Sequence, residues 1–171
     1  MKTQAKLSII VAAGLNNVIG KDGDMPWRLA ADMAHFKRIT TGKPVLMGRK
    51  TWQSLFVQPL PGRKNLVLSR DVNFQAPAAM VFSDLDAMIS KGKALAGANG
   101  EVMVIGGGVL YEAALPLCDR VYFTRVNASP DGDTYFPALD VKTWQLVQQQ
   151  PYPADDKNDH AFVTQVFEKM G

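Results

Sequence analysis

The sequence predicts an α/β fold with a mostly parallel central sheet, flanking helices and an antiparallel hairpin at the C-terminal end. Short apolar runs rich in β-branched residues recur along the chain, and helix-length segments separate several of them. Such alternation favours a parallel sheet. The last runs instead alternate polar and apolar residues, which favours an antiparallel pair. A length of 171 residues fits one domain, so we expect a single domain over residues 1–171.

The expected strands of the parallel part lack polar alternation, so we expect them to be buried on both faces of the sheet. They lie at residues 7–13, 44–48, 65–69, 80–82, 102–105 and 121–126. The antiparallel pair is expected at residues 144–149 and 161–167, with a polar loop between them.

A helix is expected over residues 29–41, ended by Gly42 just beyond its C-cap. Its apolar face contains a carboxylate, because Asp32 shares the helical spacing of Leu29, Met33 and Phe36. A charge among apolar residues is costly unless it is paired. Asp32 therefore either stabilises the N-terminal end of the helix dipole or binds a cationic or amidine-like ligand, and the sequence is compatible with both interpretations.

Two kinds of group follow the expected strands, where α/β sheets bind ligands. Gly106-Gly107-Gly108 precedes a helix-like segment, which suits either a phosphate or an ordinary tight turn. Arg49, Lys50 and Thr51 follow one strand, and Ser69 and Arg70 end the next. If these strands are neighbours, the cations and hydroxyls fit a ribose 2′-phosphate and hence NADP. Taken alone, either group of residues could consist only of solvated surface side chains.

The segment over residues 14–28 is too long for a simple connection and ends in Met25-Pro26-Trp27. Its large apolar side chains suggest a lid that closes on an apolar ligand.

Composition excludes several classes of protein. The net charge is +3, and the basic residues are scattered, so we expect no nucleic-acid partner. Cys118 is the one cysteine and lies in an apolar stretch, which favours a packed thiol and a reducing, cytoplasmic location. No run approaches the ~20 apolar residues of a membrane span. His35 and His160 stand apart from other metal ligands, so we expect no metal, and nothing demands more than a monomer.

Taken together, the motifs resemble the chromosomal-type dihydrofolate reductase family over nearly the whole chain and in family order. Matching segments are Val18-Ile19-Gly20 with Met25-Pro26-Trp27, Leu29-Ala30-Ala31-Asp32-Met33 with Phe36-Lys37, Met47-Gly48-Arg49-Lys50-Thr51-Trp52, Leu60-Pro61-Gly62-Arg63-Lys64-Asn65, Ile105-Gly106-Gly107-Gly108 with Tyr111, Tyr122 with Thr124, and Gly132-Asp133-Thr134-Tyr135-Phe136-Pro137.

The resemblance implies an NADPH-dependent enzyme that reduces 7,8-dihydrofolate to 5,6,7,8-tetrahydrofolate for one-carbon metabolism. A hydride reaches C6 and a proton reaches N5 through water. Asp32 would hold the 2-amino group and N3 of the pteridine, Arg63 would pair with the glutamate carboxylate, and antifolate inhibitors would compete there. The resemblance also implies an adenosine-binding subdomain over about residues 43–99 and a cis peptide between Gly106 and Gly107.

The residues that the resemblance assigns fall into three sets. The catalytic set is Met25, Trp27, Asp32, Tyr111 and Thr124. The substrate set is Val11, Ala12, Asp32, Met33, Phe36, Lys37, Leu55, Leu60, Arg63, Ile105 and Thr124. The cofactor set is Ala13, Ile19, Gly20, Gly48, Arg49, Lys50, Thr51, Leu68, Ser69, Arg70, Ile105, Gly106, Gly107, Gly108, Val109, Leu110 and Tyr111.

Some positions depart from the family pattern. Ala30 replaces a usual proline, residues 56–58 lengthen the connection to Pro59, and Val109 stands where some members have a basic residue. The alternative is another NADPH-dependent pterin or pyrimidine reductase on the same fold, such as the pyrimidine reductase of riboflavin synthesis. Asp32 and Arg63 favour folate. A non-catalytic folate-binding protein would need no nicotinamide site, so residues 49–51 and 106–108 argue against it.

Overall fold

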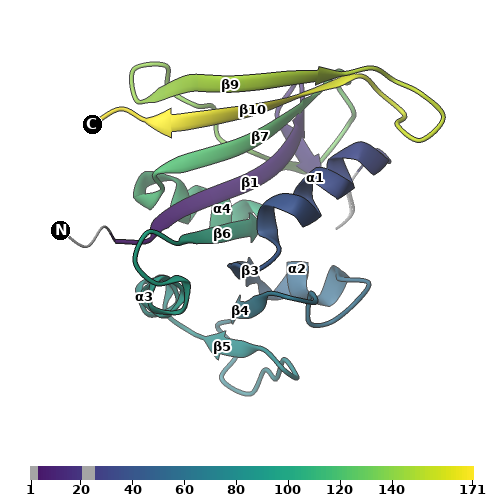
Figure 1. The fold of residues 1–171 in the computed structure, drawn as a ribbon. Coiled ribbons are helices and arrows are strands. Elements are labelled where there is room, and N and C mark those ends of the chain that lie inside the picture. Colours follow the sequence, from purple (N-terminus) through teal and green to yellow (C-terminus); the bar gives the residue numbers. More distant parts are fainter. Residues whose placement is uncertain (1–3, 21–25) are drawn as a thin grey trace.

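A computed structural model describes residues 4–20 and 26–171. Its centre is an eight-stranded sheet in the order β5-β4-β3-β6-β1-β7-β10-β9 (Figure 1). The strands are β1 Lys6–Gly14, β3 Pro44–Gly48, β4 Lys64–Leu68, β5 Met80–Phe82, β6 Glu101–Gly106, β7 Arg120–Val126, β9 Trp144–Tyr152 and β10 Phe162–Lys169. β10 runs antiparallel to both β7 and β9, and the other pairings are parallel. The expected fold class is confirmed.

Helices cover both faces of this sheet. They are α1 Ala30–Thr40, α2 Arg49–Ser54, α3 Leu85–Ala96 and α4 Gly108–Ala114, followed by the 3₁₀ turn η1 Leu115–Leu117. α1 begins and ends within a residue of the expected bounds, and Gly42 follows its C-cap with φ of 82°. The backbone already leaves the helix at the C-cap Thr41, whose ψ is 133°, and Gly42 accommodates the positive φ that follows, which glycine adopts at low cost.

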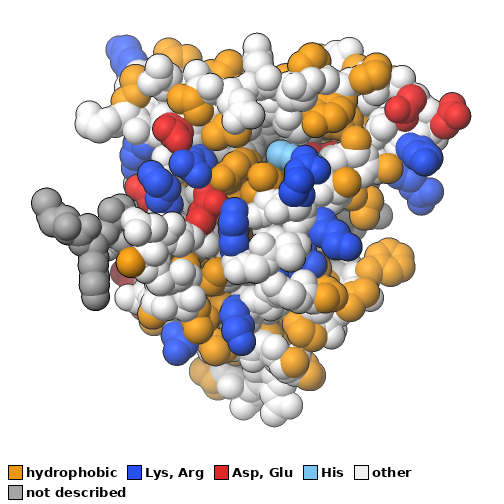
Figure 2. All heavy atoms as spheres, viewed as in Figure 1, with side chains coloured by type: hydrophobic (Ala, Val, Ile, Leu, Met, Phe, Trp, Pro, Cys, Tyr) orange, Lys and Arg blue, Asp and Glu red, His pale blue; other side chains and the backbone are white. Residues whose placement is uncertain are grey.

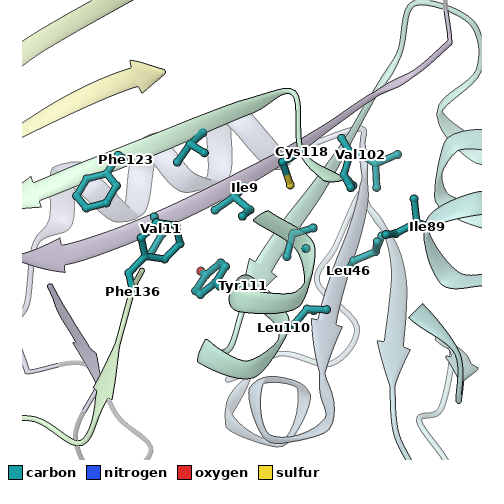
Figure 3. Packing of buried hydrophobic residues seen from close by; sticks show 14 of the residues in the cluster. Ile9, Val11, Leu46, Ile89, Val102, Leu110, Tyr111, Cys118, Phe123 and Phe136 are labelled. Carbon is teal, nitrogen blue, oxygen red and sulfur yellow. The ribbon is translucent and has the colours of Figure 1, made fainter. Parts of the chain in front are cut away.

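Alternate residues of β1 supply the two cores. Leu7, Ile9 and Val11 pack with α3 and α4 on one face, together with the buried Cys118 (Figure 3). Ile10 packs on the opposite face with Trp52 of α2 and with partly buried residues of α1. Since side chains of a strand alternate between faces, β1 is apolar on both faces from Ile9 to Ala13. This double burial is the pattern that the sequence analysis predicted.

Two expectations need correction. β5 was expected to be buried on both faces, but Met80 and Val81 are 38% and 39% exposed because β5 lies at the edge of the sheet. The segment over residues 14–28 was expected to be a long loop, but it contains β2 Val18–Gly20, which pairs with β8 Thr134–Tyr135 in a separate two-stranded sheet.

The topology brings the carboxyl ends of the parallel strands to one edge of the sheet. β1 lies between β6 and β7, and β3 lies between β6 and β4, so their ends at Gly14, Gly48, Leu68, Gly106 and Val126 are neighbours. Ligands of open α/β sheets bind at this edge, and the segments that carry the family motifs begin there. Among the described residues, no helix is long and apolar enough to span a membrane.

Candidate active site

Asp32 lies in the first turn of α1 and reaches the sheet. Its carboxylate accepts a hydrogen bond of 2.7 Å from the hydroxyl of Thr124, a buried residue of β7. Burial raises the pKa of Asp32, and the hydrogen bond from Thr124 opposes that shift. A half-buried carboxylate with one partner keeps unused acceptor capacity, so Asp32 is equipped to bind a donor or a cation.

Trp27 supplies a second polar group, just before the start of α1. Its ring is buried in a cluster with Leu29, Val126 and Phe162, and Ala12 packs against the same cluster. Its indole Nε1 is buried and has no hydrogen-bond partner among the described residues. An unsatisfied buried donor costs about 1–3 kcal/mol, so this N–H favours a site where water or a polar ligand atom binds. Met25, which was assigned to the catalytic set, lies outside the described residues.

Apolar residues from distant parts of the chain meet beside α1. Phe36, Leu55, Leu60 and Ile105 are partly buried against the same core cluster. Met33 is 70% exposed, and Lys37, Phe56 and Val57 are also exposed. The group therefore offers partly open apolar surface to a flat ligand. Val11 differs from the rest of the substrate set, because its side chain packs in the core on the opposite face of the sheet.

Arg63 lies next to the C-terminal end of α1. Its Nη1 donates to Thr40 Oγ1 at 3.0 Å, and its Nε donates to the carbonyl of Pro61 at 2.8 Å. Partial burial lowers the pKa of Arg63. These contacts orient the guanidinium while leaving other N–H groups to bind an anion, because arginine has five donors.

The glycine turn between β6 and α4 exposes part of its backbone in the middle of the row of strand carboxyl ends. The peptide between Gly106 and Gly107 is cis, as the resemblance implied. A Cβ on Gly108 would lie 2.6 Å from Thr134 Cγ2, and one on Gly107 would lie 3.5 Å from Thr51 Oγ1. A Cβ on Gly108 would thus clash with β8, whereas one on Gly107 would make ordinary contact with α2. This close-packed backbone fits a cofactor that must lie against main chain.

Tyr111 supports this turn from inside α4. Its hydroxyl donates a hydrogen bond shared between the carbonyls of Ile10, at 2.7 Å, and Ile105, at 2.9 Å, which ties β1 to β6 just before the glycines. Burial, reinforced by the negative charge of Asp32, raises the pKa of Tyr111, so the hydroxyl stays protonated. In this geometry Tyr111 holds β1 and β6 together next to the glycine turn. The neighbouring Leu110 is buried in the core, whereas Val109 is exposed.

The cationic strand ends are neighbours, as the cofactor hypothesis required. β3 and β4 pair in parallel, with Gly48 opposite Leu68. Arg49 stacks over the ring of Phe74 at 4.8 Å and pairs with Asp71 at 3.4 Å. The hydroxyl of Ser69 is less free than expected, because it accepts a hydrogen bond from the backbone N–H of Asp71.

Sequence reasoning missed both Asp71 and Phe74. Asp71 directly follows Ser69-Arg70, and its carboxylate also accepts a bond from the N–H of Asn73, which is a common turn signal. That signal could have been noticed. Lys50 and Arg70 are exposed beside this group. On the face shown in Figure 2, Lys and Arg side chains are spread among apolar and neutral ones rather than gathered in a single patch.

Comparison with known proteins decides the family. A family model described as dihydrofolate reductase matches residues 6–169. The chain belongs to the dihydrofolate reductase family. The expectations of this family and of an enzyme are both confirmed.

Named relatives cover almost the whole length of this family member. The chain is 48% identical to dihydrofolate reductase type 3 of Salmonella typhimurium over 160 residues, which is 92% of this chain and 96% of the relative. It is 43% identical to the dihydrofolate reductase of Haemophilus influenzae over 151 residues, covering 88% and 91%.

A solved structure agrees with the fold. Dihydrofolate reductase from Enterococcus faecalis, described as complexed with NADP(H) and RAB-propyl, superposes with a TM-score of 0.90 at 29% identity and covers 100% of both chains. The cofactor in that complex is the one that the family resemblance implied.

Proposed function

We propose that this member of the dihydrofolate reductase family reduces 7,8-dihydrofolate to 5,6,7,8-tetrahydrofolate with NADPH and so supplies one-carbon metabolism. The observation that carries the proposal is the pair of Asp32 and Thr124. It provides a partly buried carboxylate that is held against β7, on the same helix as Phe36 of the apolar group, and β7 lies two strands from β6 and its glycine turn. A ring with an amidine-like edge needs this combination of acceptor and apolar contact.

In the proposed complex, polar groups at the two ends of the apolar surface, Asp32 and Arg63, bind the two ends of the substrate. The free lone pairs of Asp32 accept from N3 and the 2-amino group of the pteridine, while Thr124 fixes the carboxylate. Phe36, Leu55 and Leu60 contact the aminobenzoyl part, and Arg63 pairs with the glutamate carboxylate. Arginine suits that last task because its planar fork matches a carboxylate.

The proton and the electrons reach different atoms of the pteridine. NADPH, when bound, supplies the hydride for C6. Asp32 holds the ring in place, and the proton reaches N5 through water that the orphan Nε1 of Trp27 orders. The buried Trp27 cluster also limits the amount of water beside the ring.

Residues from three strand ends would hold the cofactor. The backbone of Gly106, Gly107 and Gly108 would lie against the cofactor, since glycine has no side chain that would stand between main chain and ligand. Arg49 with Ser69 and Arg70 would bind the 2′-phosphate. We also propose that residues 43–99, which include β3, α2, β4, β5 and α3, form the adenosine-binding part of a single domain.

The direct experiment measures NADPH oxidation by the purified protein with and without dihydrofolate. Oxidation that depends on dihydrofolate, with tetrahydrofolate as product and inhibition by an antifolate, supports the proposal. Turnover of a pterin or a ribitylated pyrimidine without turnover of dihydrofolate would assign the chain to another reductase activity. Tight folate binding without any NADPH oxidation would make it a binding protein.

A further inference from the structure

The start of α1 is capped by a residue from the far end of the chain. Leu29 occupies the N-cap position, and its side chain makes no capping hydrogen bond. Instead, the N–H of Ala31 donates to Oδ1 of Asn158 at 3.0 Å, and the N–H of Ala30 donates to the carbonyl of Lys157 at 3.0 Å. The first N–H groups of a helix lack partners within it, so Asn158 does the work of an N-cap residue.

Asp155 fixes the orientation of the Asn158 side chain. Asn158 is only 6% exposed, and its Nδ2 donates to Oδ1 of Asp155 at 2.8 Å. The same carboxylate oxygen accepts from the N–H of Lys157 at 2.9 Å. Hydrogen bonds from Lys157 and Asn158 lower the pKa of Asp155, so this anchor is a stable anion. With Nδ2 held by an acceptor, Oδ1 of Asn158 must face the helix.

The same loop also fastens the residues that lead into α1. The N–H of Arg28 donates to a carboxylate oxygen of Asp159 at 3.0 Å, and the N–H of Asp159 donates to the carbonyl of Arg28 at 3.0 Å. Leu29 forms an isolated β-bridge with Asn158. In Figure 1, the loop between β9 and β10 lies beside one end of α1. The segment between Trp27 and Asp32 is therefore held along its length by this loop.

The capped N–H belongs to the residue directly before Asp32. Thr124 holds the carboxylate of Asp32 by a hydrogen bond, and Asn158 holds the backbone of the preceding residue, Ala31. We propose that Asn158 is a positioning residue for Asp32, which sets where the carboxylate lies by fixing the first turn of α1. The inference rests on the proposed function, in which Asp32 holds the pteridine.

The test compares Asn158→Ala with a matched control, Asn127→Ala, which removes an exposed asparagine at the end of β7. Small misplacements of catalytic groups are costly, so Asn158→Ala should lower kcat/KM for dihydrofolate by about tenfold or more per folded molecule. The dissociation constant for NADPH should change by less than about twofold, since the cap lies on the substrate side. Asn127→Ala should behave as the wild type in both measurements.

A double-mutant cycle separates positioning from a general loss of stability. In an Asp32→Asn background, Asn158→Ala should cost no more than about twofold in kcat/KM, because its effect runs through the missing carboxylate.

Two results would overturn the inference. One is an Asn158→Ala protein with lower thermal stability but wild-type kcat/KM per folded molecule. The other is a loss that remains undiminished in the Asp32→Asn background. If Asn158→Ala fails to fold, Asp155→Ala, which keeps Asn158 but removes its anchor, replaces it in the same cycle with an expected loss of about threefold. A wild-type protein that does not turn over dihydrofolate would instead refute the proposed function.

Discussion

The guanidinium of Arg49 lies 3.4 Å from the carboxylate of Asp71, at the point where β3 and β4 end side by side. The same guanidinium stacks on Phe74. Both side chains of the ion pair are about half exposed, so the pair itself contributes little to stability. Its effect is to hold a cation in a fixed orientation at the edge where the cofactor phosphate is proposed to bind.

The first prediction concerns the choice between NADPH and NADH. Replacing Arg49 and Arg70 with Gln should weaken NADPH binding by about 10- to 100-fold, since a hydrogen bond to a charged group is worth roughly 1.5–3 kcal/mol. NADH lacks the 2′-phosphate and should be affected far less. Asp71→Asn, which removes the competing carboxylate, should not weaken NADPH binding. Equal losses for both cofactors, measured by fluorescence titration, would refute this phosphate site.

The second prediction concerns Arg63. Arg63→Leu should raise KM for dihydrofolate by about tenfold or more, because a charge-assisted bond to the glutamate carboxylate is lost. A pteridine substrate without the glutamate should show almost no change. Lys64→Met is the control, because it removes an exposed cation from the adjacent position. If KM for dihydrofolate stays at the wild-type value, the contacts of Arg63 with Thr40 and Pro61 are its whole role.

The sequence was sufficient to predict the strands because their information is local. A buried parallel strand is a short apolar run, and each expected run coincides with a strand to within a few residues. The order of the strands is not local, and neither is exposure. Met80 and Val81 looked like part of a buried strand, yet β5 is an edge strand with 38% and 39% exposure at these positions. β2 and β8 were missed because they are too short to show a period.

The candidate site shows the same division. Asp32, Arg63 and the glycine turn could be predicted from the sequence, because each lies in a short motif of neighbouring residues. Their partners are distant in sequence: Asn158 caps Ala31 across 127 residues, and Thr124, which only the family resemblance had assigned to the site, reaches Asp32 across 92. No periodicity or spacing relates such pairs, because Thr124 of β7 and Asn158 of the loop before β10 meet α1 only in the folded sheet, where β7 and β10 pair.

The third prediction concerns a buried carboxylate at the opposite end of the strands. Burial opposes ionisation of Glu101, but hydrogen bonds from Lys43, Ser8 and Tyr122 outweigh it and lower the pKa of Glu101. A lowered pKa stabilises the fold above the ordinary carboxyl range, and the stabilisation is lost as pH falls through the folded-state pKa. Acid should therefore destabilise the protein partly through Glu101.

Glu101→Gln should lower the free energy of unfolding by about 1–3 kcal/mol near neutral pH, because Lys43 and Arg120 lose their shared anion. The variant should also lose less stability than the wild type when urea unfolding is repeated at about pH 3. Glu112→Gln, at an exposed position of α4, serves as the control. Parallel pH profiles for wild type and Glu101→Gln would show that the network does not titrate as described.

The last prediction concerns Asp32, whose substitution separates stability from activity. Burial raises the pKa of Asp32, so the folded state binds its proton more tightly than the unfolded state does. By linkage, Asp32 does not reduce the free energy of unfolding below the ordinary carboxyl pKa. The free energy of unfolding then falls as pH rises from that value through the folded-state pKa. Asp32→Asn keeps an oxygen that accepts from Thr124 and removes the buried charge. The variant should therefore be as stable as the wild type, or more stable, near neutral pH.

Activity should change in the opposite direction to stability. Without the carboxylate, kcat/KM for dihydrofolate at neutral pH should fall by at least ~10²-fold, while NADPH binding stays nearly constant. The defect should shrink as pH falls, because protonation of the substrate by solvent replaces what the carboxylate assists. Thermal unfolding and steady-state kinetics on the same preparations give both quantities. If Asp32→Asn is instead less stable and turns over normally per folded molecule, Asp32 serves only to complement the dipole of α1.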